Sequence, residues 1–404
     1  MDADRHEVVV IGAGAAGLGV AVALQRRGVD DVTVLERAGT LASSWRGRYD
    51  GLRLNTVRQL SGLPREPIPS NAGTWPSREA FTSYLEDIAE RKRLDVRFGV
   101  EVERIDRGEG HWRLVTSSES LHARFVVVAT GYDRVPRVPD WPGRDTFTGE
   151  LLHGSGFRNP GPYRGRDVLV VGAGNTGTEI ATRLVDSAAR VRVSFRTPVN
   201  IMPPRFLGLP ATLLARINES APAWLVDRGA FLMQRLVWGD LSQYGMPRSP
   251  YGIATELRVR GLGATLDRGF VAALKAGGLK LVSAVERFDG PDVVLADGER
   301  IQPQVVIAAT GYRHGLEPLV GHLGVLLPSG RPAACKGGSH PDASGLYFNG
   351  YWLPLSGQLP AMRRSSRRIA RALARERRRG ARTANKRERP PRGGLSRWSR
   401  ADDT

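Results

Sequence analysis

Residues 8–17 read VVVIGAGAAG, and this stretch decides the fold class. Its first four residues form an apolar run without polar interruption, which predicts a strand buried on both faces. Gly12, Gly14 and Gly17 follow with the spacing G-x-G-x-x-G. The first glycine permits a tight turn, the second lets a pyrophosphate approach backbone amides, and the third lets the next helix pack closely on the strand. The stretch therefore predicts a Rossmann-type turn that holds phosphates at a helix N-terminus.

The strand expected after this helix, residues 32–35, ends on Glu36, and Arg37 follows it. A carboxylate at this position can accept both ribose hydroxyls of an adenosine. The glycine pattern alone is also compatible with a plain tight turn, but the flanking strand, helix and acid favour nucleotide binding. We therefore expect Glu36 and Arg37 to bind the cofactor at this first site.

The same unit returns at residues 168–177, which read VLVVGAGNTG. The residues expected to bind a cofactor in this second turn are Gly172, Gly174, Asn175 and Gly177. The next strand ends on Ser194-Phe195-Arg196, with no acid at the ribose position, and Arg196 lies 19 residues after the third glycine, as Glu36 does in the first unit. Arginine is the expected residue where a 2′-phosphate must be accommodated. We assign FAD to the site with Glu36 and NADPH to the site with Arg196 and Ser194, although Arg196 as a solvated strand end stays the alternative.

A second repeat supports a duplicated architecture. Residues 125–132 read FVVVATGY and residues 305–312 read VVIAATGY, each an apolar strand that ends in Ala-Thr-Gly-Tyr. Thr130, Gly131 and Gly311 are therefore expected to contact cofactor. We predict an α/β fold with two Rossmann-like dinucleotide-binding domains, in which an NADPH domain (156–308) is inserted within an FAD domain (1–155 and 309–375). Two redox carriers in one chain indicate that hydride passes from one to the other.

Composition excludes several classes of protein. The chain of 404 residues has one cysteine, Cys335, which rules out an internal disulfide, a Cys-x-x-Cys pair and a thiolate zinc site. The seven histidines show no metal-ligand spacing, so no metal is expected. The apolar N-terminal run follows acidic residues and is interrupted by glycines, unlike a signal peptide. No transmembrane segment is expected, and we expect a cytoplasmic protein.

Most of the net charge of +18 lies after Arg363, in a segment rich in arginine. Residues 376–404 are expected to form a basic, disordered tail because they offer little to bury. Such a tail predicts at most a weak contact with anionic surfaces. No nucleic-acid partner is expected, since no nucleic-acid-binding fold precedes the tail.

The segment between the two glycine motifs carries a family resemblance. It reads Phe147-x-Gly149-x-x-x-His153-x-x-x-Phe157-Arg158, which resembles in full the linker motif of the flavin-containing monooxygenases. The resemblance extends along about 360 residues and looks closest to the YUCCA-like branch. It implies an enzyme that uses FAD, NADPH and O2 to insert one oxygen atom into a small organic substrate through a C4a-(hydro)peroxyflavin. In this family the role of His153 is mainly structural.

The resemblance also suggests residues near the flavin. Trp45 and the segment 49–55 look like the flavin-facing stretch of the family, and Asn55 is the candidate catalytic residue, an amide that would hydrogen-bond the peroxide or retained NADP⁺. The competing interpretation of Asn55 is an Asx-type turn beside Thr56. Gly357 and Gln358 would place a helix N-terminus near the flavin, or would simply begin a helix.

Some features depart from the family pattern and leave the substrate open. Gly-Ser-Gly follows His153 where the YUCCA branch commonly has two serines, and Asn55 stands where many members carry histidine. The substrate could be a sulfur or nitrogen nucleophile, an oxo acid or a natural-product intermediate. The alternative functions are a flavin-dependent NAD(P)H reductase without oxygenation and a flavin-binding sensor without enzyme activity.

Overall fold

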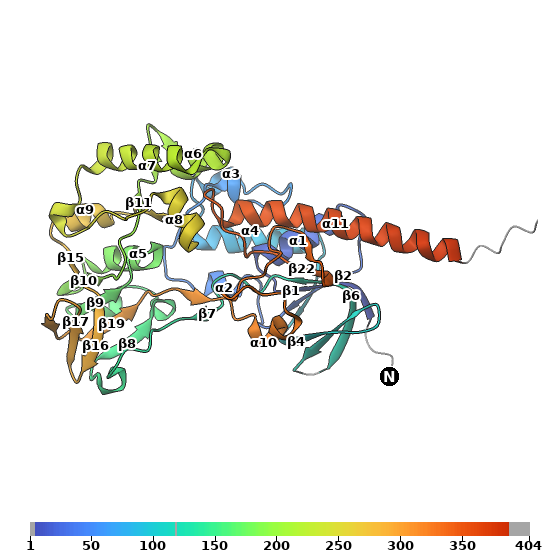
Figure 1. Cartoon of the computed structure of the whole chain (residues 1–404), viewed down its shortest axis with the longest axis horizontal. Helices are drawn as coiled ribbons and strands as arrows, with labels where there is room; N and C mark the ends of the chain where they lie inside the picture. Colours follow the sequence, from blue (N-terminus) through green and yellow to red (C-terminus); the bar gives the residue numbers. More distant parts are fainter. Residues whose placement is uncertain (1–4, 118, 388–404) are drawn as a thin grey trace, which may run out of the picture.

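The computed structural model describes residues 5–117 and 119–387. Two sheets, each built around parallel strands, lie apart along the long axis of the molecule (Figure 1). In the first sheet the path runs β21-β22-β6-β1-β2-β3, and a hairpin of β4 and β5 extends β6. The pairings from β22 to β3 are parallel, whereas those of β21, β4 and β5 are antiparallel. Its strands are β1 (Arg5–Ile11), β2 (Val32–Glu36), β3 (Asp95–Phe98), β4 (Val102–Arg107), β5 (Trp112–Thr116), β6 (Ser120–Val128), β21 (Ser339–His340) and β22 (Ala343–Phe348).

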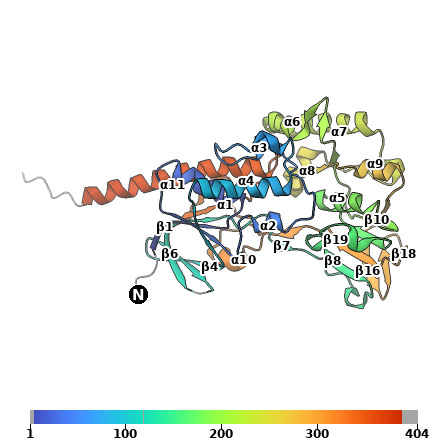
Figure 2. The same ribbon diagram turned by 180° about the vertical axis from the view of Figure 1, so that it is seen from behind.

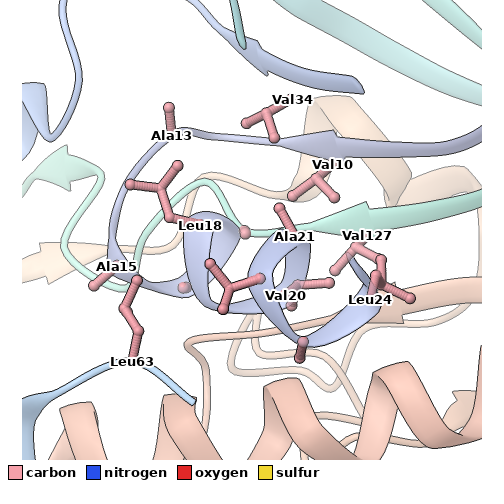
Figure 3. Close-up of a cluster of buried hydrophobic side chains, with 14 of the residues drawn as sticks. Val10, Ala13, Ala15, Leu18, Val20, Ala21, Leu24, Val34, Leu63 and Val127 are labelled. Carbon is pink, nitrogen blue, oxygen red and sulfur yellow. The ribbon is translucent and has the colours of Figure 1, made fainter. Parts of the chain in front are cut away.

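Strand β1 is buried on both faces, as its unbroken apolar run predicts. Val8 and Val10 face a core under α1 (Ala15–Gln25), α4 (Arg78–Arg91) and α11 (Gln358–Arg387). Val9 and Ile11 face a second core on the other side of the sheet, which contains the β4–β5 hairpin and α10 (Glu317–Val320). Figure 3 shows α1 packed on the strands through Val20, Ala21 and Leu24. The strand therefore anchors both layers of the first domain.

The second sheet has the order β15-β10-β9-β19-β8, and every pairing in it is parallel. Its strands are β8 (Glu150–His153), β9 (Asp167–Val171), β10 (Arg190–Ser194), β15 (Lys280–Val282) and β19 (Val305–Ala308). One face is covered by α5 (Asn175–Leu184) and α9 (Phe270–Lys275), and the other by an antiparallel sheet of β16 (Val285–Asp289), β17 (Asp292–Leu295) and β18 (Arg300–Ile301). In sequence, all five strands lie between β6 and β21 of the first sheet. The α/β class with two Rossmann-like units is confirmed.

The expected end of the first FAD segment at residue 155 was wrong for strand β8. This strand pairs with the edge of β19 from Glu150 to His153 and so belongs to the second sheet. The placement depends on main-chain pairing with a strand about 155 residues later, and a four-residue segment has too short a pattern to reveal its partner.

Short elements connect and cover the two units. Strands β7 (Val135–Pro136) and β20 (Tyr312–Arg313) pair antiparallel where the chain passes between the sheets. Beside the second sheet lie α6 (Ala211–Ile217), α7 (Ala223–Trp238), α8 (Ile253–Arg260) and the short strand pairs β11 (Ile201–Met202) with β14 (Thr265–Leu266) and β12 (Arg205–Phe206) with β13 (Leu209–Pro210). Two further single-turn helices are α2 (Ser43–Arg46) and α3 (Arg58–Ser61). Over the described ranges, no helix combines the length and apolarity needed to cross a bilayer.

Helix α11 corrects the expectation of disorder from residue 376, because it continues to Arg387 and projects beyond the first sheet (Figure 2). Ile369 and Leu373 are fully buried in the core under α1. Further along, the Tyr347 hydroxyl donates to Glu376 at 2.5 Å. These contacts, which composition alone does not reveal, stabilise the helix. The rest of the expected tail, residues 388–404, lies outside the described residues.

Candidate functional site

The first glycine turn has the geometry of a phosphate cradle. Gly12 has φ +106°, and a Cβ there would lie 2.6 Å from the Ala129 carbonyl oxygen. A Cβ at Gly17 would lie 1.9 Å from the Gly12 oxygen, so helix α1 could not approach the strand with any larger residue. At Gly14 a Cβ would meet nothing within 4 Å, and no side chain caps the helix. The free amides of the first helical turn therefore face open space that fits a pyrophosphate.

Glu36 lies at the rim of this turn. Its side chain is buried, and its two carboxylate oxygens accept hydrogen bonds from the backbone amides of Ala13 (2.8 Å) and Ala38 (3.0 Å). The carboxylate is therefore held beside the turn, where the expected ribose would lie. Arg37 instead points to the surface and pairs with Glu101 at 3.4 Å, so its expected contact with a cofactor stays a prediction.

The second glycine turn repeats this geometry. Gly172 has φ +116° and a Cβ there would lie 2.4 Å from the Ala309 oxygen, while a Cβ at Gly177 would lie 1.8 Å from the Gly172 oxygen. Gly174 again faces open space and α5 has no side-chain cap. The Asn175 side chain is occupied otherwise, since its Oδ1 accepts from the Leu266 amide at 2.9 Å. Its side chain therefore anchors the 264–266 segment and leaves its backbone amide as the group that could reach a phosphate.

Strand β10 carries the two residues predicted to select the second nucleotide. The Ser194 side chain is fully buried and donates to the Ser283 carbonyl oxygen at 2.7 Å, which ties β10 to the end of β15. Arg196 is exposed just beyond the strand and has no carboxylate within 4.0 Å in the part of the chain that the structure describes. Its guanidinium is available for a phosphate, whereas the Ser194 hydroxyl already has an acceptor.

The two Ala-Thr-Gly-Tyr segments end β6 and β19 beside their glycine turns. Gly131 and Gly311 have φ +98° and +82°, and each faces open space. The Thr130 hydroxyl lies 2.8 Å from the hydroxyl of Tyr351, whose burial raises its pKa to about 12. The structure thus brings each segment to the carboxyl edge of its own parallel sheet, where ligands bind in open α/β folds.

Asn55 lies at the end of a segment that we call the bridging loop (residues 47–55). Its Oδ1 is buried and has no hydrogen-bond partner among the described atoms. Leu54, the residue before it, is held on both sides: its amide donates to Pro76 O (2.9 Å) and its carbonyl accepts from Arg268 Nη2 (3.0 Å). A buried amide oxygen without a partner is costly. The Asn55 Oδ1 atom therefore fits a role in which bound cofactor or substrate supplies its hydrogen-bond donor.

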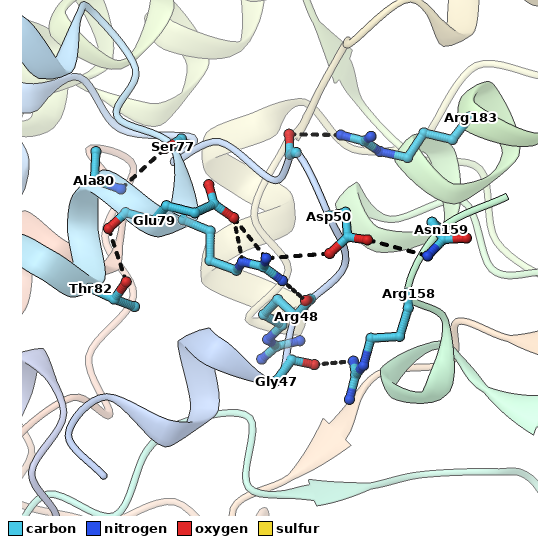
Figure 4. A network of polar contacts seen from close by, with 12 residues as sticks. Gly47, Arg48, Asp50, Ser77, Glu79, Ala80, Thr82, Arg158, Asn159 and Arg183 are labelled. Carbon is cyan, nitrogen blue, oxygen red and sulfur yellow. Dashed lines mark hydrogen bonds and ion pairs between the residues drawn. The ribbon is translucent and has the colours of Figure 1, made fainter. Parts of the chain in front are cut away.

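Residues of the second unit hold the bridging loop (Figure 4). Arg183 of α5 donates to the Gly51 carbonyl oxygen at 2.8 Å, and Asn159 donates to Asp50 at 3.2 Å. Arg158 donates to the Gly47 carbonyl oxygen. Because Arg78 of α4 also donates to Arg48 O and Asp50 Oδ1, the loop is held by both units.

A buried pair completes this attachment, and sequence reasoning missed it. The Tyr49 hydroxyl donates to Glu179 Oε2 at 2.8 Å, and both side chains are buried. Burial raises the pKa of Tyr49 and also that of Glu179. Arg183 lies over the Tyr49 ring at 5.1 Å. The two partners are 130 residues apart in the chain, so no local pattern could have linked them.

The remaining predicted residues lie around α1 and the start of α11. Trp45 packs edge-on against Phe81 with 5.0 Å between ring centroids. Gly357 has φ +96°, and a Cβ there would lie 2.6 Å from Thr56 Cγ2, next to Asn55. Gln358 begins α11 and its Nε2 donates to Gly350 O at 2.9 Å. The structure thus brings Gly357 to the end of the bridging loop, and the Gln358 amide is already engaged.

The linker motif joins the two units. His153 Nε2 donates to the Gly311 carbonyl oxygen at 3.0 Å, while its Nδ1 accepts from the Ser155 amide at 3.0 Å. Burial lowers the pKa of His153, which favours this neutral ring. Phe157 is fully buried and stacks on Tyr163. Through His153 and Arg158 the motif thus contacts the Gly311 segment and the bridging loop.

Comparison with known proteins places this geometry among redox enzymes. Residues 9–205 match the family model described as pyridine nucleotide-disulphide oxidoreductase. The single cysteine, which is buried, cannot supply the dithiol that this name implies. A rice protein (Oryza sativa subsp. japonica) named indole-3-pyruvate monooxygenase YUCCA1 is 37% identical over 310 residues, which cover 76% of each chain.

Solved structures share the fold across nearly the whole chain. A flavin-containing monooxygenase from Stenotrophomonas maltophilia superimposes with a TM-score of 0.71 at 22% identity, over 92% of this chain and 99% of that one. The protein OTEMO, solved in complex with FAD and NADP, gives a TM-score of 0.71 at 16% identity, over 93% and 85% of the two chains. At these identities the solved structures show the fold alone. The comparison of function depends on relatives such as the rice protein at 37% identity.

Proposed function

The chain belongs to the flavin-containing monooxygenase family, in its YUCCA-like branch, and from that premise we propose that its substrate is an aryl-substituted 2-oxo acid. It is an FAD-dependent monooxygenase that uses NADPH. When bound, FAD would supply the redox chemistry by which hydride from NADPH and a proton convert O2 into one oxygen atom in the product and one water molecule. The reductase and sensor alternatives are not favoured.

The observation that supports binding of both nucleotides is the pair of open glycine cradles linked by one loop. Gly14 and Gly174 each leave space for a pyrophosphate at an uncapped helix start. We propose that the first cradle, with Glu36, holds FAD and that the second, with Arg196, holds NADPH. The bridging loop, which contacts both units, would orient Asn55 toward the reacting groups. Its attachment to α5 would also help to keep water out of the space between them.

Two observations support an anionic substrate of the 2-oxo acid type. Curated relatives at 31–37% identity carry names that specify indole-3-pyruvate. Arg268 lies against the end of the bridging loop, and its buried Nε has no hydrogen-bond partner in the described structure. Burial lowers the pKa of Arg268, although arginine stays protonated at neutral pH. Its guanidinium is the group that we assign to the substrate carboxylate.

A substrate panel tests this assignment. NADPH consumption and hydrogen peroxide release would be measured together with aryl-pyruvates, amines and thioethers. We expect aryl-pyruvates to raise NADPH consumption without matching peroxide and to lose CO2. Arg268→Met should raise KM for the aryl-pyruvate about tenfold, since a charge-assisted bond contributes roughly 1.5–3 kcal/mol. Coupled oxidation of an amine or thioether alone would overturn the substrate assignment and leave the monooxygenase unaffected.

Two finer expectations also belong to this proposal. A cytoplasmic location would be tested by fractionating cells that express the tagged chain, and recovery in the membrane or exported fraction would contradict it.

The weak contact of the basic tail with anionic surfaces would be tested by vesicle cosedimentation before and after truncation following Gly380. If the full chain and the truncated chain bind vesicles equally, the tail does not make this contact.

A further inference from the structure

A groove lined by arginines lies on the first unit, away from both glycine cradles. It has a volume of about 660 Å³ and runs between α11, the end of α1 and the segment Pro64–Arg65. The arginines from α11 are Arg367, Arg371, Arg375 and Arg378. The opposite wall contributes Arg26, Arg27 and Arg65. Helix α1 has 11 residues, so a rise of 1.5 Å per residue puts the groove about 16 Å from the phosphate cradle at the other end of that helix.

The four arginines of α11 form one exposed row. Their spacing of four, four and three residues puts them on the same face of the helix. The opposite face, with Ile369 and Leu373, is buried against α1. Like charges at this spacing repel one another. The fold therefore holds a row of positive charge that it does not need for packing.

The arginines of the groove have almost no negative partners. Among them only Arg26 lies within 4.0 Å of a carboxylate of the described chain, namely Glu66 at 3.7 Å. Glu66 also accepts Lys92 at 3.0 Å, so its charge is shared. Arg65, on the opposite wall, has φ +62°, a conformation that residues other than glycine adopt at a cost. Elsewhere arginines pair closely, as Arg300 does with Asp289 at 2.6 Å. The missing counter-charge thus points to an external anion.

We propose that this groove binds a ligand that carries several phosphate groups. Guanidinium groups bind phosphate oxygens in pairs of parallel hydrogen bonds, and seven of them suit more than one phosphate. The volume lies in the range of pockets for small ligands, roughly 300–1,000 Å³. No aromatic side chain lines the groove, so it lacks the stacking platforms that hold single-stranded nucleic acid. The phosphates could belong to a soluble polyphosphate or to clustered lipid headgroups.

Binding assays on the full chain with FAD bound test the proposal and separate the two sources. Calorimetry at 0.15 M salt would use sodium tripolyphosphate as the soluble probe. Cosedimentation would use vesicles of phosphatidylglycerol and phosphatidylcholine as the lipid probe. Binding of tripolyphosphate alone would identify a soluble ligand, and binding of vesicles alone would identify a lipid surface. Absence of both at this salt concentration would overturn the proposal.

A matched pair of variants locates the binding. Arg367→Gln/Arg371→Gln/Arg375→Gln should weaken binding of the active probe at least about tenfold, which corresponds to roughly 1.4 kcal/mol. Arg228→Gln/Arg235→Gln/Arg258→Gln removes the same charge from exposed positions on α7 and α8 and should change Kd less than about twofold. Equal weakening by both variants would show a net-charge effect and contradict a groove. If the triple variant fails to fold, Arg371→Gln alone is measured and should still weaken binding more than Arg235→Gln.

Discussion

Among single residues, we propose that the two strand ends after the glycine turns, Glu36 and Arg196, select the nucleotide that each turn receives. Glu36 is buried and held by two backbone amides. Arg196 is exposed and free of ion pairs within the described ranges. Asn55 differs from both because its buried oxygen has no partner in the chain. These three environments lead to two predictions about single side chains.

Arg196→Ala should raise KM for NADPH about tenfold and leave KM for NADH nearly unchanged. Only NADPH has a 2′-phosphate, and loss of a charge-assisted contact with it removes roughly 1.5–3 kcal/mol in a buried setting and less at an exposed one. Steady-state kinetics with both nucleotides measure the effect. Arg190→Ala, at the other end of the same strand and paired with Asp167, is the control. An equal rise for both nucleotides would remove Arg196 from the 2′-phosphate site.

Asn55→Asp should leave FAD bound but divert NADPH oxidation into hydrogen peroxide. A carboxylate at this position loses the amide donor and adds negative charge where the buried oxygen already lacks a partner. The ratio of peroxide formed to NADPH consumed measures the effect and should rise several-fold. Asn218→Asp, on the exposed end of α6, serves as the control. A variant that stays fully coupled would leave Asn55 with the role of a turn residue.

At the level of elements, the bridging loop is the part that connects the two units. Tyr49 of the loop and Glu179 of α5 share a buried hydrogen bond, and Arg183 of α5 holds the Gly51 carbonyl. The loop is therefore tied to α5, the helix that follows the second glycine turn. Because the loop contacts both units and ends on Asn55, a change in the Tyr49–Glu179 contact would be expected to alter the position of Asn55.

The buried carboxyl of Glu179 predicts a pH dependence of stability. Burial raises its folded-state pKa above the unfolded value, so its protonated form stabilises the fold at low pH and this contribution is lost as pH rises through the folded pKa. Glu179→Gln keeps the acceptor for Tyr49 and should flatten this loss. The Tm difference between variant and wild type, followed from pH 5 to 8, should increase with pH. Glu286→Gln, an exposed control, should show a constant difference. A flat difference for Glu179→Gln would contradict the prediction.

On the scale of the whole molecule, α11 closes the first unit. It starts beside the bridging loop, where Gly357 meets Thr56, and its middle fills the core against α1. It then continues past the sheet with one row of arginines exposed. One helix thus starts beside the proposed cofactor site, fills part of the core and lines the proposed phosphate groove.

Leu373→Ala should destabilise the first unit by about 2–5 kcal/mol, because a fully buried leucine loses both its transfer energy and its packing. We expect a lower Tm and partial loss of FAD on gel filtration, since α11 begins beside the proposed flavin site. Thermal unfolding followed by flavin fluorescence measures both. Leu207→Ala, whose side chain is 86% exposed, should change Tm little. Unchanged flavin retention in an otherwise destabilised Leu373→Ala protein would separate α11 from the cofactor site.

Local patterns in the sequence were sufficient for the two parallel sheets, both glycine turns and the strand-end residues Glu36 and Arg196. These features depend on hydrophobic periodicity and on glycine positions that tolerate no side chain, so they are visible within about 30 residues. The membership of β8 in the second sheet, the Tyr49–Glu179 pair and the helical course of residues 376–387 were decided only by tertiary structure. The physical reason is that the pairing of β8 and the Tyr49–Glu179 contact depend on partners distant in the chain. Residues 376–387 extend a helix that is fixed just before them by the burial of Ile369 and Leu373.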